Sequence, residues 1–281
     1  MRQEVRSLHD EKALDDEFYH DLILPRLNPK KVRGMNKAKS ILIASIPTPE
    51  TKAFFHWAGQ AIEFTVPPTY GNYAAASNRA MKLLREALLP EGNWMARAIL
   101  PAKLLAVRSG LAQYGRNNIT YIPKYGSFHT LAAVYTDYEN PEDHWQEKTA
   151  LSKCEKCRAC VRACPANAIS EDRFLIRAEH CLTYHNEMDS SHPFPDWISP
   201  EAHNSIIGCM HCQRVCPYNR EMMGWHRNRG DFNEVETRYL LKGKFTGSQA
   251  RMMDMKLKKI GLDLSVFPRN LQVHLRQRGL L

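Results

Sequence analysis

The stretch Cys154-Glu-Lys-Cys157-Arg-Ala-Cys160-Val-Arg-Ala-Cys164-Pro165 has the cysteine spacing of a [4Fe–4S] cluster segment. Two residues separate each of the first three cysteines, so the backbone wraps one corner of a cubane and three thiolates reach three irons. The fourth cysteine stands three residues further on, before a proline, and starts a helix that points away. It therefore ligates another cluster, and the spacing predicts two clusters rather than one.

A second run, Cys209-Met-His-Cys212-Gln-Arg-Val-Cys216-Pro217, lacks the first cysteine of the usual four. Cys181 is the only other cysteine, so it is expected to fill that place. Two cubanes need eight thiolates, and the chain has eight cysteines. Zinc and disulfides are weaker explanations, because zinc sites use two pairs of ligands and disulfides need a secreted chain. We assign Cys154, Cys157, Cys160 and Cys216 to cluster one, and Cys164, Cys181, Cys209 and Cys212 to cluster two.

Length and composition place the chain among ordinary globular proteins. Its 281 residues, 43% of them apolar, suit one large or two small domains. No apolar run approaches the roughly 18 residues of a membrane span, and the N-terminus shows neither an apolar leader nor a twin-arginine signal. Eight cysteines kept as thiols or cluster ligands fit a reducing compartment. We expect a cytoplasmic protein of an anaerobic or low-oxygen cell.

The formal charge of +9 admits two interpretations. It predicts a basic surface for RNA, or it compensates the negative charge of the thiolate-bound clusters while the rest covers a solvated face. Compensation is favoured, because several basic residues lie inside the cysteine runs. They are Lys153, Lys156, Arg158, Arg162 and Arg214.

The remaining pattern predicts an α+β protein. An N-terminal mixed sheet with flanking helices precedes a two-cluster module of the bacterial ferredoxin type. The predicted parts are an α/β domain at 1–150, a double [4Fe–4S] domain at 151–220 and a helical tail at 221–281 packed on them. Helices are expected at 9–27, 73–88, 101–109 and 248–260, strands at 39–46, 61–66, 119–122 and 128–135, and a linker at 138–152. A carrier ferredoxin needs only the cluster module, so the N-terminal half should hold what the electrons act on.

Residues 109–137 are the most specific stretch outside the cysteines. Glycines at 110, 115 and 126 let a ligand approach the backbone, and the stretch carries several side-chain donors. Such backbone and amide groups commonly hold flat, amide-rich ligands. The alternative is that Gly110 only ends a helix and Gly126 only serves a turn. The side-chain donors are Arg116, Asn117, Asn118 and Lys124.

This stretch and the cysteine runs together resemble the cobalamin-dependent iron–sulfur reductases, namely the tRNA epoxyqueuosine reductases and the reductive dehalogenases. The resemblance covers about 100–220 well and 39–46 weakly, and it includes a lone Cys181 between the runs. The matching motifs are Gly110-Leu111, Gly115-Arg116-Asn117, Pro123-Lys124-Tyr125-Gly126 and Thr136-Asp137.

The resemblance implies a nitroreductase-like N-terminal domain that binds cobalamin, with the two clusters passing electrons to the cobalt. It also implies that 109–137 lines the corrinoid pocket. The cofactor-binding residues expected on this basis are Gly110, Leu111, Gly115, Arg116, Asn117, Asn118, Lys124, Tyr125 and Gly126.

Two departures from the family pattern concern its catalytic acid and its length. The register of the aspartate that serves epoxyqueuosine reductases as general acid falls on Ala96, and no acidic residue occurs between Glu91 and Asp137. Those enzymes are also longer, many with a helical-repeat extension used for tRNA. The dehalogenases use a tyrosine donor, so no catalytic residue is singled out here. The candidate donors, for each of which core packing is the favoured explanation, are Tyr70, Tyr73, Tyr114 and Tyr121.

Three functions are therefore expected, in order of preference. The first is a cobalamin-dependent reductase that cleaves a substrate reductively. The second is an electron-transfer protein or reductive activator of another corrinoid protein, which needs no proton donor. The third is a shortened tRNA epoxyqueuosine reductase. The expected partners are a redox donor such as ferredoxin or flavodoxin, and a small-molecule substrate or corrinoid protein, with tRNA possible but not favoured and no membrane.

Overall fold

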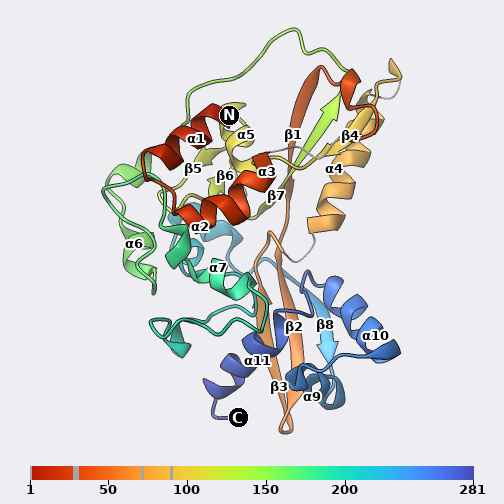
Figure 1. Ribbon diagram of the computed structural model, residues 1–281, viewed down its shortest axis with the longest axis vertical. Helices are drawn as coiled ribbons and strands as arrows, with labels where there is room; N and C mark the ends of the chain where they lie inside the picture. Colours follow the sequence, from red (N-terminus) through yellow and green to blue (C-terminus); the bar gives the residue numbers. More distant parts are fainter. Residues whose placement is uncertain (1, 28–31, 71–72, 89–90) are drawn as a thin grey trace. The chain divides into compact units, whose positions relative to one another are not determined.

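The computed structural model describes residues 2–27, 32–70, 73–88 and 91–281, and it confirms an α+β protein with a mixed sheet (Figure 1). The strands are β1 (Ser40–Pro47), β2 (Glu50–Trp57), β3 (Gln60–Val66), β4 (Met95–Ala98), β5 (Gln113–Tyr114), β6 (Thr120–Tyr121), β7 (His129–Thr136) and β8 (His226–Phe232). The α-helices are α1 (Arg2–Asp10), α2 (Asp16–Phe18), α3 (Leu24–Leu27), α4 (Tyr73–Leu88), α5 (Ala102–Arg108), α6 (Ala159–Ala163), α7 (Leu182–Glu187), α8 (His211–Arg214), α9 (Glu234–Lys242), α10 (Gly247–Lys258) and α11 (Phe267–Arg276).

The chain forms two compact units, each assembled from three separate segments. The sequence analysis placed the domain boundaries at 150 and 220 on the basis of the cysteine pattern. That division into three consecutive domains stays a prediction. The first unit comprises Met1–Pro47, Ala74–Arg158 and Ile169–Glu179, and the second Thr48–Tyr73, Ala159–Ala168 and His180–Leu281.

The first unit is built on the antiparallel sheet β1-β7-β4. Strand β7, HTLAAVYT, is apolar and almost fully buried, as a central strand should be. Helix α5 packs on β1 and β7, with Ala106 and Val107 completely buried. The short hairpin of β5 and β6 follows α5, so the 109–137 stretch comprises this hairpin and the central strand β7.

The second unit is built on the mixed sheet β3-β2-β8, in which β3 runs antiparallel and β8 parallel to the central strand β2. Its core is aromatic. The Phe55 ring stacks on that of Phe232 at 4.4 Å and lies 5.1 Å from that of Phe267, between ring centroids. All three side chains are completely buried. Since two of them come from β8 and α11, the segment after the cysteines supplies much of this core.

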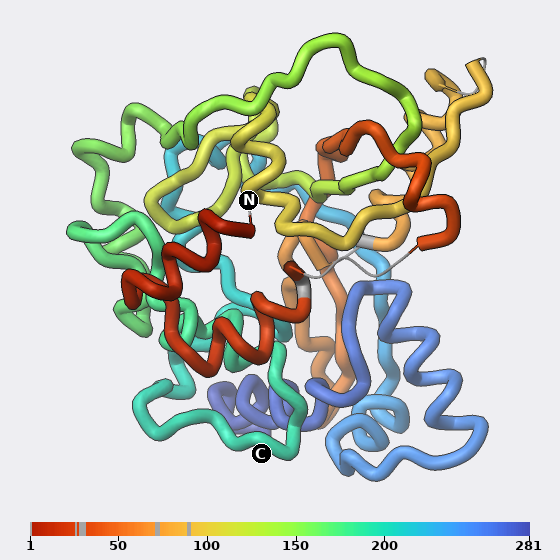
Figure 2. Tube along the Cα trace, turned by 45° about the horizontal axis from the view of Figure 1, so that its top comes forward, coloured from red at the N-terminus to blue at the C-terminus, as the bar shows by residue number. Residues whose placement is uncertain are grey.

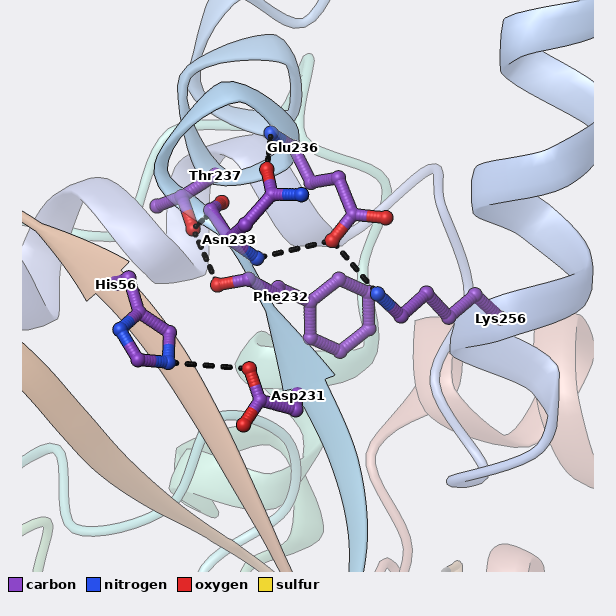
Figure 3. A network of polar contacts seen from close by, with 7 residues as sticks. All are labelled: His56, Asp231, Phe232, Asn233, Glu236, Thr237 and Lys256. Carbon is purple, nitrogen blue, oxygen red and sulfur yellow. Dashed lines mark hydrogen bonds and ion pairs between the residues drawn. The ribbon is translucent and has the colours of Figure 1, made fainter.

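A polar network fixes the start of α9 and the position of α10 (Figure 3). Asn233 Oδ1 accepts a hydrogen bond from the Glu236 amide at 3.0 Å, and Glu236 Oε2 accepts one from the Asn233 amide at 2.9 Å. This reciprocal capping box satisfies two amides that have no partner inside the helix. Lys256 of α10 reaches Glu236 Oε2 at 2.6 Å and lies 4.6 Å from the centre of the Phe232 ring. One lysine thereby joins α10 to both α9 and β8.

Most of the predicted elements are confirmed within a few residues. The exception is the single helix expected at 9–27, which is wrong. Helix α1 ends at Asp10, Lys12 takes a left-handed conformation (φ 57°), and a new helix begins after Asp15, whose side chain accepts a hydrogen bond from the Phe18 amide. An Asp cap outweighs the apolar periodicity here. No helix in the described ranges is long and apolar enough to cross a membrane.

Candidate iron–sulfur centre

The loop that carries the first two cysteines is held by Arg158. Its Nη1 donates to the carbonyl oxygens of Glu155 at 2.8 Å, Cys157 at 3.2 Å and Cys154 at 3.4 Å. Its Nε donates to Glu171 at 2.5 Å. One guanidinium therefore gathers three carbonyls of the cysteine loop, while the Cys154 and Cys157 amides donate to the carbonyls of Leu151 and Lys153.

Arg116 also binds this loop, although the resemblance implied that it contacts a corrinoid. Its Nη2 donates to the Cys154 carbonyl at 2.8 Å and its Nη1 to the Glu171 carbonyl at 3.1 Å. The structure thus links the 109–137 stretch directly to the cysteine segment. Arg116 thus places a positive charge beside the first cysteine loop, and compensation of the clusters by the basic excess stays a prediction.

Cys164, Cys181 and Cys209, all in the second unit, interact electrostatically with one another. Burial, together with the charges of the other two cysteines, raises the pKa of the Cys209 thiol to about 12. Burial likewise raises the pKa of Cys181, and Cys164 adds to this effect. The raised pKa values of Cys181 and Cys209 disfavour their thiolates unless cationic irons offset the charge. This donor set therefore fits a cluster, and it places Cys181 beside two cysteines of its predicted ligand set.

Within the second unit, helices α6 and α8 pack against each other and so bring the end of the first cysteine run to the second run. Cys160 lies on α6 and Cys212 on α8. Beyond α6, the Ala168 amide donates to the Cys164 sulfur at 3.3 Å. An amide that donates to a thiolate sulfur tunes the reduction potential of the cluster it ligates.

Two buried asparagines join the loops before Cys209 and after Cys181. Asn186 of α7 donates to the Gly208 carbonyl at 2.7 Å. Asn270 of α11 donates to the carbonyls of Asn186 and Ile206, both at 2.9 Å. Both asparagines are at most 1% exposed. Helix α11 therefore holds the segments beside these two cysteines, and its trace can be followed in Figure 2. No sequence motif indicated this role.

Arg269, the neighbour of Asn270, binds the segment that follows α7. Its guanidinium donates to the carbonyls of His192 at 2.6 Å, His185 at 2.7 Å and Met188 at 3.0 Å, and stacks 4.0 Å from the Phe194 ring. Burial lowers the pKa of Arg269 to about 10, so the group stays charged at neutral pH. It holds the irregular backbone after Cys181 in one shape.

Tyr70 closes the same side of the second unit. Its hydroxyl donates to Glu187, and burial, followed by the Glu187 charge, raises its pKa well above 10. A Cβ at Gly208 would lie 2.8 Å from the Tyr70 ring, and Gly208 has a φ of 66°. Only glycine fits there. As a candidate proton donor, Tyr70 has its proton directed at a neighbouring carboxyl group.

The other candidate donors are part of the packing of the first unit. Burial raises the pKa of Tyr114 to about 12, and the Tyr121 hydroxyl accepts a hydrogen bond from Asn117. The side chain of Tyr73 lies outside the described part of the structure. The hydrogen bonds and pKa values of Tyr70, Tyr114 and Tyr121 therefore single out none of them as a proton donor.

Within the described ranges, no three His, Cys, Asp or Glu side chains are close enough to hold a single metal ion. A cubane places each thiolate on a different iron, so its ligands do not converge on one point. His211, inside the second run, is bonded through Nε2 to the Ala202 carbonyl at 2.9 Å. The geometry therefore gives no support to a zinc site.

The polar side chains expected to contact a corrinoid mostly bind the protein itself. Asn118 donates to the Phe174 carbonyl at 2.8 Å and accepts from the Ile176 amide at 2.7 Å. Gly110 ends α5 with a φ of 77°, close to the Gln146 side chain. The exposed exception is Lys124, on the turn that ends at Gly126. The expected contacts stay a prediction; in this turn the Tyr125 and Gly126 amides donate to the carbonyls of Pro123 and Ile122.

The position of the family's acid has no substitute in the described structure. Ala96 lies on β4, paired with Tyr135 of β7. The nearest acid that follows in the sequence, Asp137, accepts hydrogen bonds from the Trp94 amide at 2.8 Å and from Asn93 at 3.2 Å. Asp137 is therefore occupied in fixing the start of β4.

Known proteins show the same combination of cysteine runs and fold. A family model described as a 4Fe-4S double cluster binding domain matches residues 153–219, which contain all eight cysteines. An epoxyqueuosine reductase of Cyclobacterium marinum is 35% identical over 119 residues, 41% of this chain and 36% of the relative. A tetrachloroethene reductive dehalogenase of Dehalobacter restrictus is 30% identical over 167 residues, 56% of this chain and 29% of the relative. The chain spans about a third of the curated relatives it matches.

Solved structures extend the likeness beyond the cysteines. The epoxyqueuosine reductase of Streptococcus thermophilus superposes with a TM-score of 0.63 at 19% identity, over 98% of this chain and 73% of that one. The enzyme of Bacillus subtilis gives 0.61 at 21% identity, over 93% and 74%. At such identities the likeness establishes the fold. The chain thus contains a 4Fe-4S double cluster domain and is similar, over part of its length, to epoxyqueuosine reductases and reductive dehalogenases.

Proposed function

We propose that this protein is an iron–sulfur reductase that passes electrons from two [4Fe–4S] clusters to a bound corrinoid for the reductive cleavage of a substrate. The observation that carries the proposal is the gathering of Cys164, Cys181 and Cys209 at one place in the second unit. That arrangement completes the second cysteine run, and with it a pair of clusters. A single cluster would store one electron at a time, whereas two neighbouring clusters form a path along which electrons pass.

The residues of this chain position and tune the clusters. Arg158 and Arg116 shape the first cysteine loop, and Asn186, Asn270 and Arg269 shape the loops around Cys181 and Cys209. A bound corrinoid would supply a redox-active cobalt that the protein itself lacks. The 123–126 turn, with Lys124 exposed, is the part of the 109–137 stretch that remains available to hold it.

A second candidate is an electron-transfer protein or reductive activator that serves another corrinoid protein. The specific observation in its favour is that no free acid is found, among the described residues, where the similar enzymes are expected to carry their proton donor. The family's acid position is Ala96, and Asp137 is bonded to the Trp94 amide. Delivery of electrons to cobalt needs no proton donor, whereas most reductive cleavages do. Reduction of epoxyqueuosine in tRNA is a third candidate, supported by similarity to the reductases that carry this name.

The deciding experiment is anaerobic reconstitution with iron, sulfide and hydroxocobalamin, followed by desalting, an absorption spectrum and metal analysis. We expect roughly eight irons per chain, four for each cubane, together with one cobalt. Roughly eight irons without cobalt would refute corrinoid binding and leave the activator as the better proposal. Roughly four irons or fewer would contradict both.

A further inference from the structure

A basic strip lies on the second unit around Cys216. We define it as Arg214, Val215, Arg220, Met223, Arg227 and Arg229, all exposed. Val215 and Met223 are large apolar side chains with exposed fractions of 43% and 37%. Val215 directly precedes Cys216, so the apolar part of the strip lies next to a thiolate ligand. Exposed apolar groups surrounded by charge commonly mark protein interaction sites.

The turn that carries Cys216 is rigid. The Cys216 amide donates to the Gln213 carbonyl at 3.3 Å, and the Asn219 amide donates to the Cys216 carbonyl at 3.0 Å. The completely buried Asn219 side chain also donates to the Gln213 carbonyl, at 2.8 Å. Since this backbone is fixed, the neighbouring side chains present one surface rather than a mobile loop.

Glu50 ties the start of β8 to this turn. It pairs with His226 in the β2–β8 ladder, and its amide donates to the Trp225 carbonyl at 3.1 Å. Its carboxylate, buried with the side chain, lies 3.9 Å from Arg214 Nη2. The chain segments on both sides of Cys216 therefore share one face, which continues along β8, an edge strand of its sheet.

The strip is positively charged beyond what its own acids compensate. Between 214 and 229 there are four arginines and a single acid, Glu221. The other basic stretch of this unit, α10, differs. Its Lys256 pairs with Glu236 at 2.6 Å and its Lys258 with Asp254 at 2.6 Å. The four arginines and single acid of 214–229 thus place an excess of basic side chains next to Cys216.

We propose that the basic strip docks a small acidic electron-carrier protein, which delivers electrons to the cluster ligated by Cys216. The inference rests on the proposed function, because it requires that the clusters accept electrons. In each transfer the carrier loses one electron and a [4Fe–4S]²⁺ core becomes [4Fe–4S]⁺, with no bond made or broken. Complementary charge would orient the carrier, and the apolar contact at Val215 and Met223 would exclude water between the two redox centres.

The test uses the anaerobic, cluster-loaded protein and a reduced acidic two-cluster ferredoxin as the probe. Stopped-flow absorbance follows electron transfer in the wild type and in the variant Arg220→Glu/Arg227→Glu. We expect the second-order rate constant of the variant to fall at least ~10-fold, with a weaker dependence on salt. A second variant, Met223→Ser, should lower the rate without changing its salt dependence.

The control is Arg251→Glu/Lys259→Glu, an equal charge change on α10 that should leave the rate within about twofold of the wild type, since it spares the strip. Equal losses in both charge variants, or no loss in either, would overturn the proposal. So would a strip variant that loses binding to bulk tRNA while its rate with ferredoxin is unchanged. Iron content and the spectrum after photoreduction by deazaflavin report on the clusters separately, so failure of the proposed function would be visible there.

Discussion

At the scale of single residues, Cys181 decides whether the second cluster can form. It lies apart from both cysteine runs in the sequence, yet it interacts with Cys164 and Cys209 in the structure. The count of cysteines alone assigns Cys181 to the second cluster, because it is the one cysteine outside the two runs. The residues that shape its surroundings could not be found in this way, since Asn186, Asn270 and Arg269 belong to no recognisable motif and only the folded chain brings them to Cys181.

Replacing Cys181 by alanine is expected to remove one cluster and leave the other, because the remaining three ligands leave one iron without a thiolate. Iron per chain should fall by about half, or roughly four irons. The double variant Cys181→Ala/Cys209→Ala should lose no more iron than the single one, whereas Cys181→Ala/Cys154→Ala should lose nearly all. Full iron in the single variant would show that the assignment is wrong.

Two buried histidines should make the protein sensitive to acid. Burial lowers the pKa of His203 to about 4 and that of His274 to about 4. Both pKa values in the folded protein lie below the usual 6.5. Between pH 6.5 and about pH 4, the unfolded chain therefore binds protons at these histidines that the folded chain does not bind. The free energy of unfolding therefore falls with pH across this window, by about 2 kcal/mol for each histidine at pH 5.

The variant His203→Phe isolates this effect, because His203 Nδ1 is buried without a hydrogen-bond partner among the described residues. We expect its melting temperature to drop less than that of the wild type between pH 7 and pH 5. The exposed His144→Ala should keep the wild-type slope. Parallel slopes in all three proteins would contradict the assignment of acid sensitivity to this histidine.

At the scale of secondary-structure elements, the sequence pattern predicted those helices and strands that their own residues favour. The apolar run at 39–46 forms β1, and the sequence from Tyr73 to Leu88 forms α4. The patterns failed where tertiary contacts decide. Strand β8, HRNRGDF, is polar and exposed over its first half, and it becomes a strand because β2 offers a parallel partner. Helix α11 likewise gave no sign that it positions cysteine-bearing loops.

The helix α11 offers a direct test of that role through Asn270. Alanine at this position leaves the carbonyls of Asn186 and Ile206 buried without a donor, at about 1–3 kcal/mol each. We expect a lower melting temperature and reduced occupancy of the cluster that Cys181 ligates, measured by anaerobic iron analysis and electron paramagnetic resonance. Arg276→Ala, exposed on the same helix, should change neither quantity. Normal iron content in Asn270→Ala would contradict the positioning role.

At the scale of the whole molecule, the segment after the cysteines is part of the second unit rather than an addition to it. The aromatic core combines Phe55 from β2 with Phe232 and Phe267 from β8 and α11. The sequence predicted a helical tail packed on the domains, and the structure adds that it completes a sheet. Because the two compact units interleave along the chain, their composition could not be predicted from the order of sequence patterns.

Ending the chain at Gly224 should therefore abolish the second unit and not merely shorten it. The truncated protein would lack a strand of the mixed sheet and every core residue that follows, so we expect aggregation and little iron after anaerobic reconstitution. Supplying residues 225–281 as a separate polypeptide should restore part of the iron. A truncated chain that remains monomeric with full iron would contradict the interdependence.

The hydrogen bonds from Asn270 to the loops before Cys209 and after Cys181 also constrain the order of biosynthesis. All eight cysteines leave the ribosome before α11 has been translated. A nascent chain therefore exposes its thiols before it can hold the loops that arrange Cys181 and Cys209. Insertion of the cluster predicted for Cys181 is therefore expected only after α11 has been translated and has packed against these loops.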